Sequence, residues 1–433
     1  MNPRGAERKE KILSEVICLK LLVVCQYYYP ENFQITPICE QLAADGYEVT
    51  VLTGLPNYPT GIVPDEYKKG HRDEWINGVH VLRCFEYGRK KGVVGLALNY
   101  LSYCLSASFK IKEMSDDFNM VFIYQLSPIL MGIPAIRYSN KHKKPLLLYC
   151  CDLWPESIKM YIKKENNPVF KLIKQISKQV YSSCDYIFTQ SSSFISYLTK
   201  THNVADDKIS YLPAFADDKY LSEDFSLDNG IIDFVFLGNL GIAQNLICVL
   251  KAINQIKDIP GFKVHFVGDG SMLEEMKRFV KDNDMDSVVS FYGRRPIEEM
   301  PDFYKLADAC LVSLDAKNET GLTLPAKVQG YMAAGKTILG MISGSTQEVV
   351  RDAQCGACVD SGDVDAFADT LKDFILNNSN YADCGENGRK YFVENFKNVS
   401  TFSPKIIMVD YFFFISCKLI VMYSASCFVF NDD

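Results

Sequence analysis

The sequence has few histidines and lacks the paired Cys and His spacings from which metal centres are built. Its 433 residues include only 5 histidines, and no two of them have the spacing of metal ligands on a helix. The 15 cysteines include a single CxxC pair, Cys355 and Cys358, and no second pair completes a zinc site. We therefore expect reduced thiols, a cytoplasmic protein, and no metal or other cofactor.

Positive charge is also in deficit. Lys and Arg number 46 against 53 Asp and Glu, and the net charge of −7 argues against general binding of nucleic acid. Residues 1–18 are charged and lack the long apolar core of a signal peptide, so we expect an extension outside the fold. The composition, 48% hydrophobic and 23% charged, is typical of a globular chain of two or three domains.

One long apolar run stands near the C-terminus. Residues 411–430 carry a single charge, Lys418, and are long enough to span a membrane. Basic residues precede the run, so a span would leave its N-terminal side in the cytoplasm. The alternative is a disrupted terminus, because the composition changes abruptly after about residue 401. Both interpretations of the 401–433 tail stay open.

Two strand–loop–helix–strand patterns divide the rest of the chain. The segment LKLLVVC leads through a helical pattern to GYEVTVLT, and IIDFVFLG leads through a second helical pattern to GFKVHFVG. This repetition predicts two doubly wound α/β domains with parallel sheets, at 19–215 and 216–400. Further strands are predicted at 79–84, 120–124, 146–150, 186–189, 288–292, 309–313, 337–341 and 356–359.

Ligands of parallel sheets bind beyond the carboxyl ends of the strands, which makes the loops there candidate sites. In the second predicted domain, the stretch 321–340 predicts a short helix with Pro325 at its first position and Gly335 just past its end. Lys327 lies in its first turn, where free N–H groups and a cation favour an anion, although an ordinary surface helix would look similar. The candidate residues are Gly238, Asn239, Gln244, Arg294, Arg295, Glu319, Gly321, Leu322, Thr323, Lys327 and Gln329.

In the first predicted domain, the motif CCDLWPES places two acidic residues directly after a buried strand. Asp152 and Glu156 at such a position are more often catalytic or substrate-binding than structural. The loops after the first two strands add Glu31, Asn32, Asn57 and Tyr58.

Nine motifs in order over residues 19–400 resemble the retaining glycosyltransferases of family 4, which have two Rossmann-like domains in the GT-B fold. The resemblance is closest to the WbuB-like bacterial group, which adds sugars in O-antigen or capsule assembly. The motifs are QYYYPENF, GYEVTVLTGLPNYPTG, DLWPES, SCDYIFTQS, LPAFADDKY, FLGNLGIAQN, FYGRRPIEEMPDFYKLADACLVSL, PAKVQGYMAAGKTILG and GSTQEVV with CGACVDSGD.

The resemblance implies that a nucleotide sugar, with UDP favoured, binds in the second domain and a polyprenyl-diphosphate-linked sugar binds to the first. It also implies transfer with retention and without a metal, at the inner face of the cell membrane. Asp152 and Lys327 would be the catalytic residues. Basic, apolar helices predicted within 88–112 and 163–181 are candidates for contact with the membrane surface. The acceptor-side residues would be Glu31, Asn32, Asn57, Tyr58 and Glu156.

The chain also departs from the family pattern. Family members commonly carry two glutamates eight positions apart, where this sequence has Gly321 and Gln329. Asn239 and Gln244 stand in place of the usual Arg and Lys, so Lys327 gains importance. A catalytically degenerate protein that binds nucleotide or a partner transferase is therefore an alternative. An epimerase is disfavoured by the scarcity of histidine, and a dehydrogenase by the absence of GxGxxG after the first strand.

Overall fold

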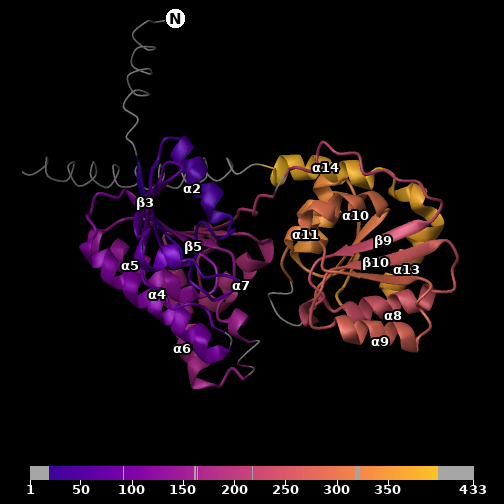
Figure 1. Cartoon of the computed structure of the whole chain (residues 1–433), viewed down its shortest axis with the longest axis horizontal. Coiled ribbons are helices and arrows are strands. Elements are labelled where there is room, and N and C mark those ends of the chain that lie inside the picture. Colours follow the sequence, from indigo (N-terminus) through magenta and orange to yellow (C-terminus); the bar gives the residue numbers. More distant parts are fainter. Residues whose placement is uncertain are drawn as a thin grey trace, which may run out of the picture. The chain divides into compact units, whose positions relative to one another are not determined.

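The computed structural model describes residues 19–90, 92–159, 162, 164–216, 218–316 and 322–397. The predicted extension, Glu319, Gly321 and the 401–433 tail lie outside the described residues. The described chain divides into two compact units, residues 19–188 with 198–210 and residues 189–197 with 211–397 (Figure 1). The predicted limits of the two domains remain predictions.

The first sheet has eight strands in the order β3-β4-β2-β1-β5-β6-β7-β8. Neighbours from β4 to β6 pair in parallel, whereas β3 pairs antiparallel with β4 at one edge. All residues of β5 and β6 are buried, as expected for parallel strands covered on both faces. The strands are β1 (Lys20–Val24), β2 (Glu48–Thr53), β3 (Asp73–Ile76), β4 (Val79–Arg83), β5 (Met120–Gln125), β6 (Leu146–Cys150), β7 (Tyr186–Thr189) and β8 (Ile209–Tyr211).

Helix α6 (Pro168–Ser183) begins with a clear local signal. Asn167 accepts a hydrogen bond from the Val169 amide and Pro168 takes the first position of α6, a strong helix start. Helix α4 packs on α5, and α5 packs on α6. The helices are α2 (Ile35–Ala44), α3 (Asp65–Lys69), α4 (Val93–Glu113), α5 (Gly132–His142), α6 (Pro168–Ser183) and α7 (Ser192–His202).

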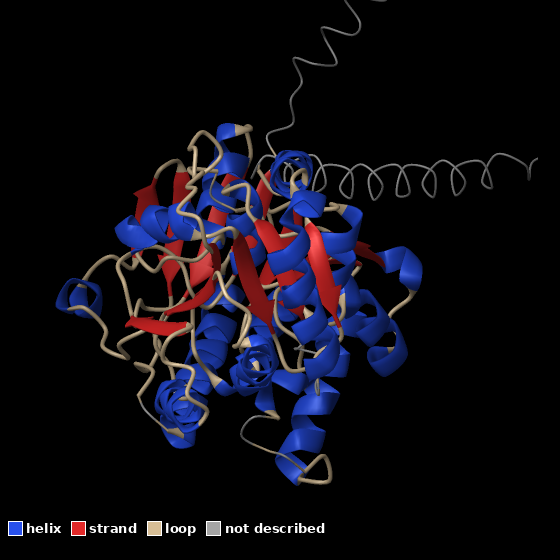
Figure 2. Ribbon diagram, turned by 90° about the vertical axis from the view of Figure 1, so that its right-hand side faces the viewer, coloured by secondary structure: helices blue, strands red, loops and turns tan. Residues whose placement is uncertain are grey.

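The second sheet has six parallel strands in the order β11-β10-β9-β12-β13-β14. Alternate residues of its strands enter two separate cores. Phe234 and Phe236 pack with α8, α9 and α13, whereas Val235 and Leu237 pack with α10, α11, α12 and α14. Figure 2 shows strands between layers of helices. The strands are β9 (Ile232–Leu237), β10 (Phe262–Val267), β11 (Val289–Gly293), β12 (Ala309–Ser313), β13 (Thr337–Met341) and β14 (Gly356–Val359). The helices are α8 (Leu246–Ile256), α9 (Leu273–Asp282), α10 (Met300–Leu306), α11 (Ala326–Ala333), α12 (Ser345–Asp352), α13 (Val364–Asn377) and α14 (Cys384–Asn395).

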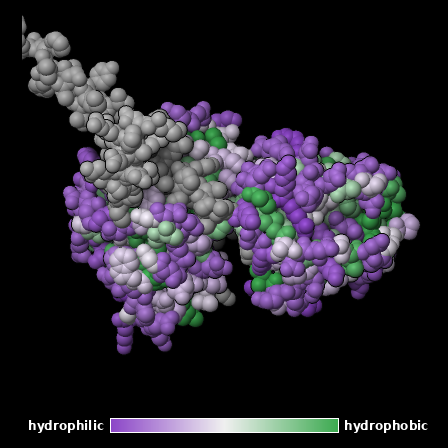
Figure 3. Space-filling model, turned by 90° about the horizontal axis from the view of Figure 1, so that it is seen from above, coloured by the Kyte–Doolittle hydropathy of each residue, from purple (hydrophilic) through white to green (hydrophobic). Residues whose placement is uncertain are grey.

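The predicted strands are confirmed, and β6, β7, β12, β13 and β14 have the predicted bounds. Strands β3 and β8 were not predicted. The face seen in Figure 3 is largely hydrophilic, with apolar side chains in smaller patches. Within the described ranges, no helix combines the length and apolar composition needed to cross a bilayer.

Candidate functional site

Two glycines bring the carboxyl ends of β9 and β10 close together. Gly238 has a φ of +131° and Gly268 a φ of +145°, values that other residues rarely adopt. A Cβ on Gly268 would lie 1.8 Å from the carbonyl oxygen of Gly238, and one on Gly238 would lie 3.0 Å from Lys327 Nζ. A side chain at position 238 or 268 would therefore be strained, and the two glycines leave the backbone open to a ligand.

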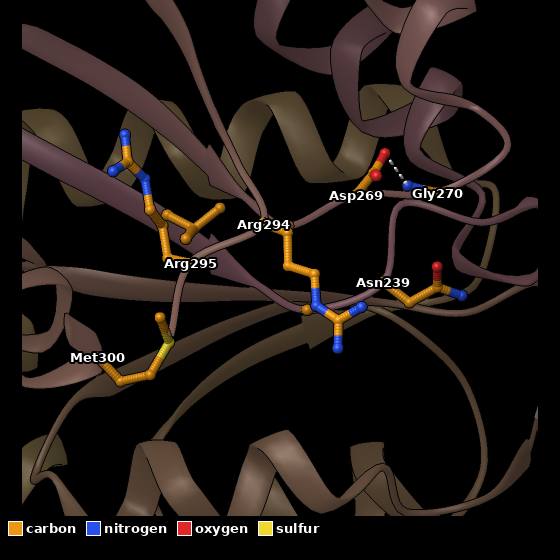
Figure 4. Close-up of a pocket in the computed structure, with 9 residues that line it drawn as sticks. Asn239, Asp269, Gly270, Arg294, Arg295 and Met300 are labelled. Carbon is orange, nitrogen blue, oxygen red and sulfur yellow. Dashed lines mark hydrogen bonds between the residues drawn. The ribbon is translucent and has the colours of Figure 1, made fainter. Parts of the chain in front are cut away.

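A cavity of about 680 Å³ opens at this edge of the second sheet (Figure 4). An adjoining cavity of about 650 Å³ shares Gly238, Arg294 and Arg295 with it and continues to Lys327. In Figure 4, Arg294 points towards Asn239, whereas Arg295 extends to the opposite side of its loop. The first cavity is lined by Gly238, Asn239, Val267, Gly268, Asp269, Gly270, Arg294, Arg295 and Met300.

Lys327 is a partly buried cation in the first turn of α11. Its Nζ lies 3.7 Å from the centroid of the Phe236 ring and 3.4 Å from Gln244 Oε1. Burial lowers the pKa of Lys327 to about 7, because the apolar surroundings disfavour the ammonium form. An anionic ligand in this cavity would favour the charged form again.

The start of α11 differs in detail from the prediction. Pro325 is the residue before the helix rather than its first residue, while Gly335 follows the helix end with a φ of +67°, as predicted. Gln329 is buried and donates a 2.6 Å hydrogen bond to the carbonyl of Ala214, and it lines neither cavity. Contact between Gln329 and a ribose therefore stays a prediction.

Leu322 and Thr323 lead into this helix and contact the turn after β13 and the start of α12. Thr346 Oγ1 donates a 2.8 Å hydrogen bond to the carbonyl of Thr323. Gly344 has a φ of +73°, and a Cβ there would lie 2.6 Å from the carbonyl oxygen of Leu322. The predicted sugar contacts of Leu322 and Thr323 remain predictions.

In the first unit, Asp152 is the second residue after the end of β6. Both of its carboxylate oxygens accept hydrogen bonds from serine hydroxyls, one from Ser127 and one from Ser157. Trp154 Nε1 donates to Ser127 Oγ over 3.2 Å and so extends this arrangement. Burial raises the pKa of Asp152, against the opposing effect of the two serines. The carboxylate is thus held in one orientation.

The predicted acceptor-side residues differ in their exposure to solvent. Glu31 is buried and accepts hydrogen bonds from the amides of Asn57, at 2.7 Å, and Tyr58, at 2.5 Å. Burial raises its pKa to about 7. Glu156 forms an ion pair with Lys159 at 2.6 Å. Asn32 and Tyr58 are exposed, so Glu31 fixes the loop that presents the Tyr58 ring.

A buried polar cluster beneath this loop was not predicted. Glu86 Oε1 accepts hydrogen bonds from Gln26 at 2.8 Å, Asn57 at 3.1 Å and Asn99 at 2.6 Å. Burial raises the pKa of Glu86 to about 8. The one sequence signal that could have indicated this cluster is Asn99, a polar residue within the apolar run LALNYLSY. In the second unit, Asp269 and Met300 line the cavity and were missed, although the glycines on both sides of Asp269, just after a predicted strand, were a usable signal.

Among the residues that the structure describes, no group of three His, Cys, Asp or Glu side chains is placed to hold a metal ion.

The two sheets and the cation-lined cavity at the strand ends define a nucleotide-binding α/β class. Two family models match the chain. The model described as Glycosyltransferase Family 4 matches residues 34–220, and the model described as Glycosyl transferases group 1 matches residues 220–391. The chain therefore belongs to the group 1 and family 4 glycosyltransferases and has the GT-B fold.

Solved structures share this fold at low sequence identity. Sucrose-phosphate synthase from Thermosynechococcus elongatus is 15% identical, with a TM-score of 0.68 over 92% of this chain and 100% of that one. Anabaena HepE in complex with UDP is 12% identical, with a TM-score of 0.64 over 90% of this chain and 99% of that one. The lipopolysaccharide outer core galactosyltransferase WaaB gives a TM-score of 0.64 at 13% identity over 90% and 99% of the two chains.

A curated relative matches a shorter stretch. The GDP-mannose-dependent alpha-(1-6)-phosphatidylinositol monomannoside mannosyltransferase of Mycobacterium tuberculosis is 25% identical over 153 residues. The match covers 34% of this chain and 38% of that relative.

Proposed function

We propose that the protein is a retaining glycosyltransferase that moves a sugar from a UDP-sugar to a lipid-linked sugar acceptor. The pathway we propose is the assembly of capsule, O-antigen or exopolysaccharide, as in the WbuB-like group. One observation carries the proposal: Gly238, Arg294 and Lys327 line one cavity at the carboxyl edge of the second sheet.

The nucleotide diphosphate is proposed to bind in this cavity. As the bond between the sugar C1 and the phosphate oxygen breaks, negative charge gathers on the diphosphate, and Lys327 and Arg294 stabilise it. Because these two cations supply positive charge, the proposed transfer needs no metal. Asn239 and Gln244 offer amide donors to the phosphates. Glu319, Gly321, Leu322 and Thr323 are proposed to contact the sugar, and Gln329 and Arg295 the nucleoside.

The proposed reaction is direct displacement on one face of the sugar. The acceptor hydroxyl oxygen bonds to C1 as the C1–O bond to the phosphate breaks, and the hydroxyl proton passes to a phosphate oxygen of the leaving group. Attack from the face that the leaving group departs retains the anomeric configuration. Asp152, held by Ser127 and Ser157, is proposed to orient the acceptor hydroxyl, and Asn32 and Tyr58 to contact the acceptor.

Helix α4 supports a position at the membrane. Five apolar side chains on one helical face are between 47% and 74% exposed. Lys90 lies before the helix, and Lys110 and Lys112 lie in its last turn. An exposed apolar stripe with cations at both ends fits the anionic inner leaflet, where a polyprenyl-linked acceptor would lie. The five side chains are Val94, Leu98, Leu101, Leu105 and Phe109.

The donor proposal is tested by thermal shift with UDP, GDP, ADP, UDP-sugars and GDP-mannose, without metal. A nucleotide at 100 times its dissociation constant adds about 2.7 kcal/mol of stability, worth several degrees. We expect shifts with UDP and with one UDP-sugar, and their loss in Lys327→Met. Lys281→Met, on the exposed side of α9, is the matched control. A shift with GDP-mannose alone would replace the UDP part of the proposal.

Turnover separates the proposal from a degenerate protein. Incubation with the donor that binds and with bacterial membrane lipid should yield a lipid-linked product one sugar heavier, read by mass spectrometry. Nucleotide binding without this product from any lipid fraction would favour the degenerate alternative.

Membrane contact is tested by flotation with vesicles of phosphatidylglycerol and of phosphatidylcholine. We expect binding to the anionic vesicles only, and its loss when Leu101 and Leu105 are both changed to Glu. Binding that survives this double change would place the contact elsewhere.

A further inference from the structure

Strand β11, at the edge of the second sheet, has one extra residue in the stretch that pairs with β10. Phe266 pairs with Phe291, and the next residue, Val267, pairs with Gly293, so Tyr292 is the additional residue of a bulge. A bulge bends the strand and redirects the chain that follows it. The chain that follows is Arg294, whose side chain enters the cavity.

The bulge residue ends a chain of hydrogen bonds across three adjacent strands, in which Asp233 and His265 are buried and Tyr292 is half-buried. The Tyr292 hydroxyl lies 2.9 Å from His265 Nδ1, and His265 Nε2 lies 2.7 Å from Asp233 Oδ1. Asn229 Nδ2 donates to the other oxygen of Asp233 over 2.7 Å. Because a carboxylate oxygen accepts, His265 Nε2 is the donor to Asp233, and Nδ1 is left to accept from the tyrosine hydroxyl. The chain thus runs from β9 in the middle of the sheet to β11 at its edge.

An edge strand needs such a connection more than a central strand does. Strand β11 pairs with β10 only, so a bulge within it is specified by few backbone hydrogen bonds and can slip by one residue. Tyr292 also contacts the arginine loop directly, because its carbonyl accepts from Arg295 Nε over 3.1 Å. Its ring packs edge-on against Phe303 of α10 at 5.1 Å. A slip of Tyr292 would therefore move both arginines.

We propose that Tyr292, His265 and Asp233 form a positioning chain that fixes the β11 bulge and thereby aims Arg294 at the donor diphosphate. This inference rests on the proposed function. None of the three lines either cavity, so they are positioning residues that act through Arg294.

A double-mutant cycle on UDP binding tests the chain. Dissociation constants are measured by calorimetry for the wild type, Tyr292→Phe, Arg294→Ala and the double variant. Tyr292→Phe removes one oxygen and keeps the ring. In the wild-type background we expect it to weaken UDP binding roughly tenfold, a size typical of the coupling between residues of one hydrogen-bond network. In the Arg294→Ala background the same change should have no effect. Tyr381→Phe, which removes a hydroxyl bonded to Asp373 at 2.8 Å, should leave binding unchanged.

Each other outcome overturns the inference. Equal weakening by Tyr292→Phe with and without Arg294 would mean that the chain serves stability alone, and no weakening would mean that Arg294 is held otherwise. If Tyr292→Phe fails to fold, Asn229→Ala replaces it in the same cycle. Equal losses of UDP affinity with and without Arg294 would again mean that the chain serves stability alone. A wild type that binds neither UDP nor GDP would refute the proposed function itself.

Discussion

The lowered pKa of Lys327 should make the affinity for UDP depend on pH. In the free protein burial lowers this pKa to about 7, so a large share of the lysines is neutral at pH 7. A bound diphosphate favours the ammonium form and raises the pKa. Binding then takes up a proton at any pH above about 7, and the affinity for UDP falls as the pH rises.

The size of the effect follows from the two pKa values of Lys327. With a bound-state pKa near the ordinary value of 10.5, the dissociation constant rises roughly fiftyfold between pH 7 and pH 9, or about 2.3 kcal/mol. A terminal phosphate titrates near pH 6, so the ligand itself contributes little in this window. The free protein should respond in the opposite direction. Its free energy of unfolding rises from pH 7 to pH 9, because the unfolded lysine still binds the proton that the folded one has lost.

The measurement is calorimetric titration of UDP at pH 6, 7, 8 and 9 in buffers of different ionisation enthalpy, which also counts the protons taken up. Lys327→Arg, whose side chain stays charged, should bind with little pH dependence. Lys327→Met should bind weakly throughout, and Lys281→Met should follow the wild type. A flat wild-type affinity between pH 7 and pH 9, or the same slope in Lys327→Met, would refute the reasoning.

Three further predictions concern single residues. Asp152→Asn should lower kcat about a hundredfold or more while UDP binding stays normal, because it alters the group that orients the acceptor; a normal kcat would remove Asp152 from the reaction. Gly268→Ala should lower the free energy of unfolding by about 1–3 kcal/mol in urea titrations, since its Cβ would lie 1.8 Å from the Gly238 carbonyl oxygen. Gly261→Ala, with positive φ but no neighbour within 4 Å of its Cβ, is the control and should lose less. The Glu86 carboxyl keeps its proton in the folded state up to a pKa of about 8, so the wild type should lose stability from pH 5 to pH 8. Glu86→Gln should lose less over this range, since only Glu31 still has a pKa raised to about 7 in the same cluster, and a difference in Tm that does not change with pH would contradict this.

Much of the fold could be predicted from the sequence because parallel strands covered on both faces are continuously apolar. The strands LLLYC and TILGM show this pattern and have the predicted bounds. Strand β3, with the sequence DEWI, was missed because it is short, charged and half exposed at the sheet edge. Its place depends on antiparallel pairing with β4 rather than on its own residues.

The candidate site could be predicted only for residues whose position follows from the order of the strands in the sheet. Arg294 and Lys327 follow strands of one parallel sheet, so their meeting at one edge follows from topology. The direction of Arg294 depends on the bulge at Tyr292, which no residue type signals. Gln329 bonds to Ala214, 115 residues away, and Glu31 turns inward to the amides of Asn57 and Tyr58. Such contacts depend on tertiary packing, which local sequence patterns do not encode.

The two edge strands of the first sheet affect the tendency of the protein to aggregate at high concentration. An exposed strand edge is a template on which a strand of another molecule can add, and aggregation often begins there. Here one edge is β3, four residues long, with Asp73 paired to His80 and Glu74 paired to Arg83. The other edge is β8, with three residues. Edges this short and, at β3, this charged offer little length for intermolecular pairing, so the sheet is protected against growth into fibrils.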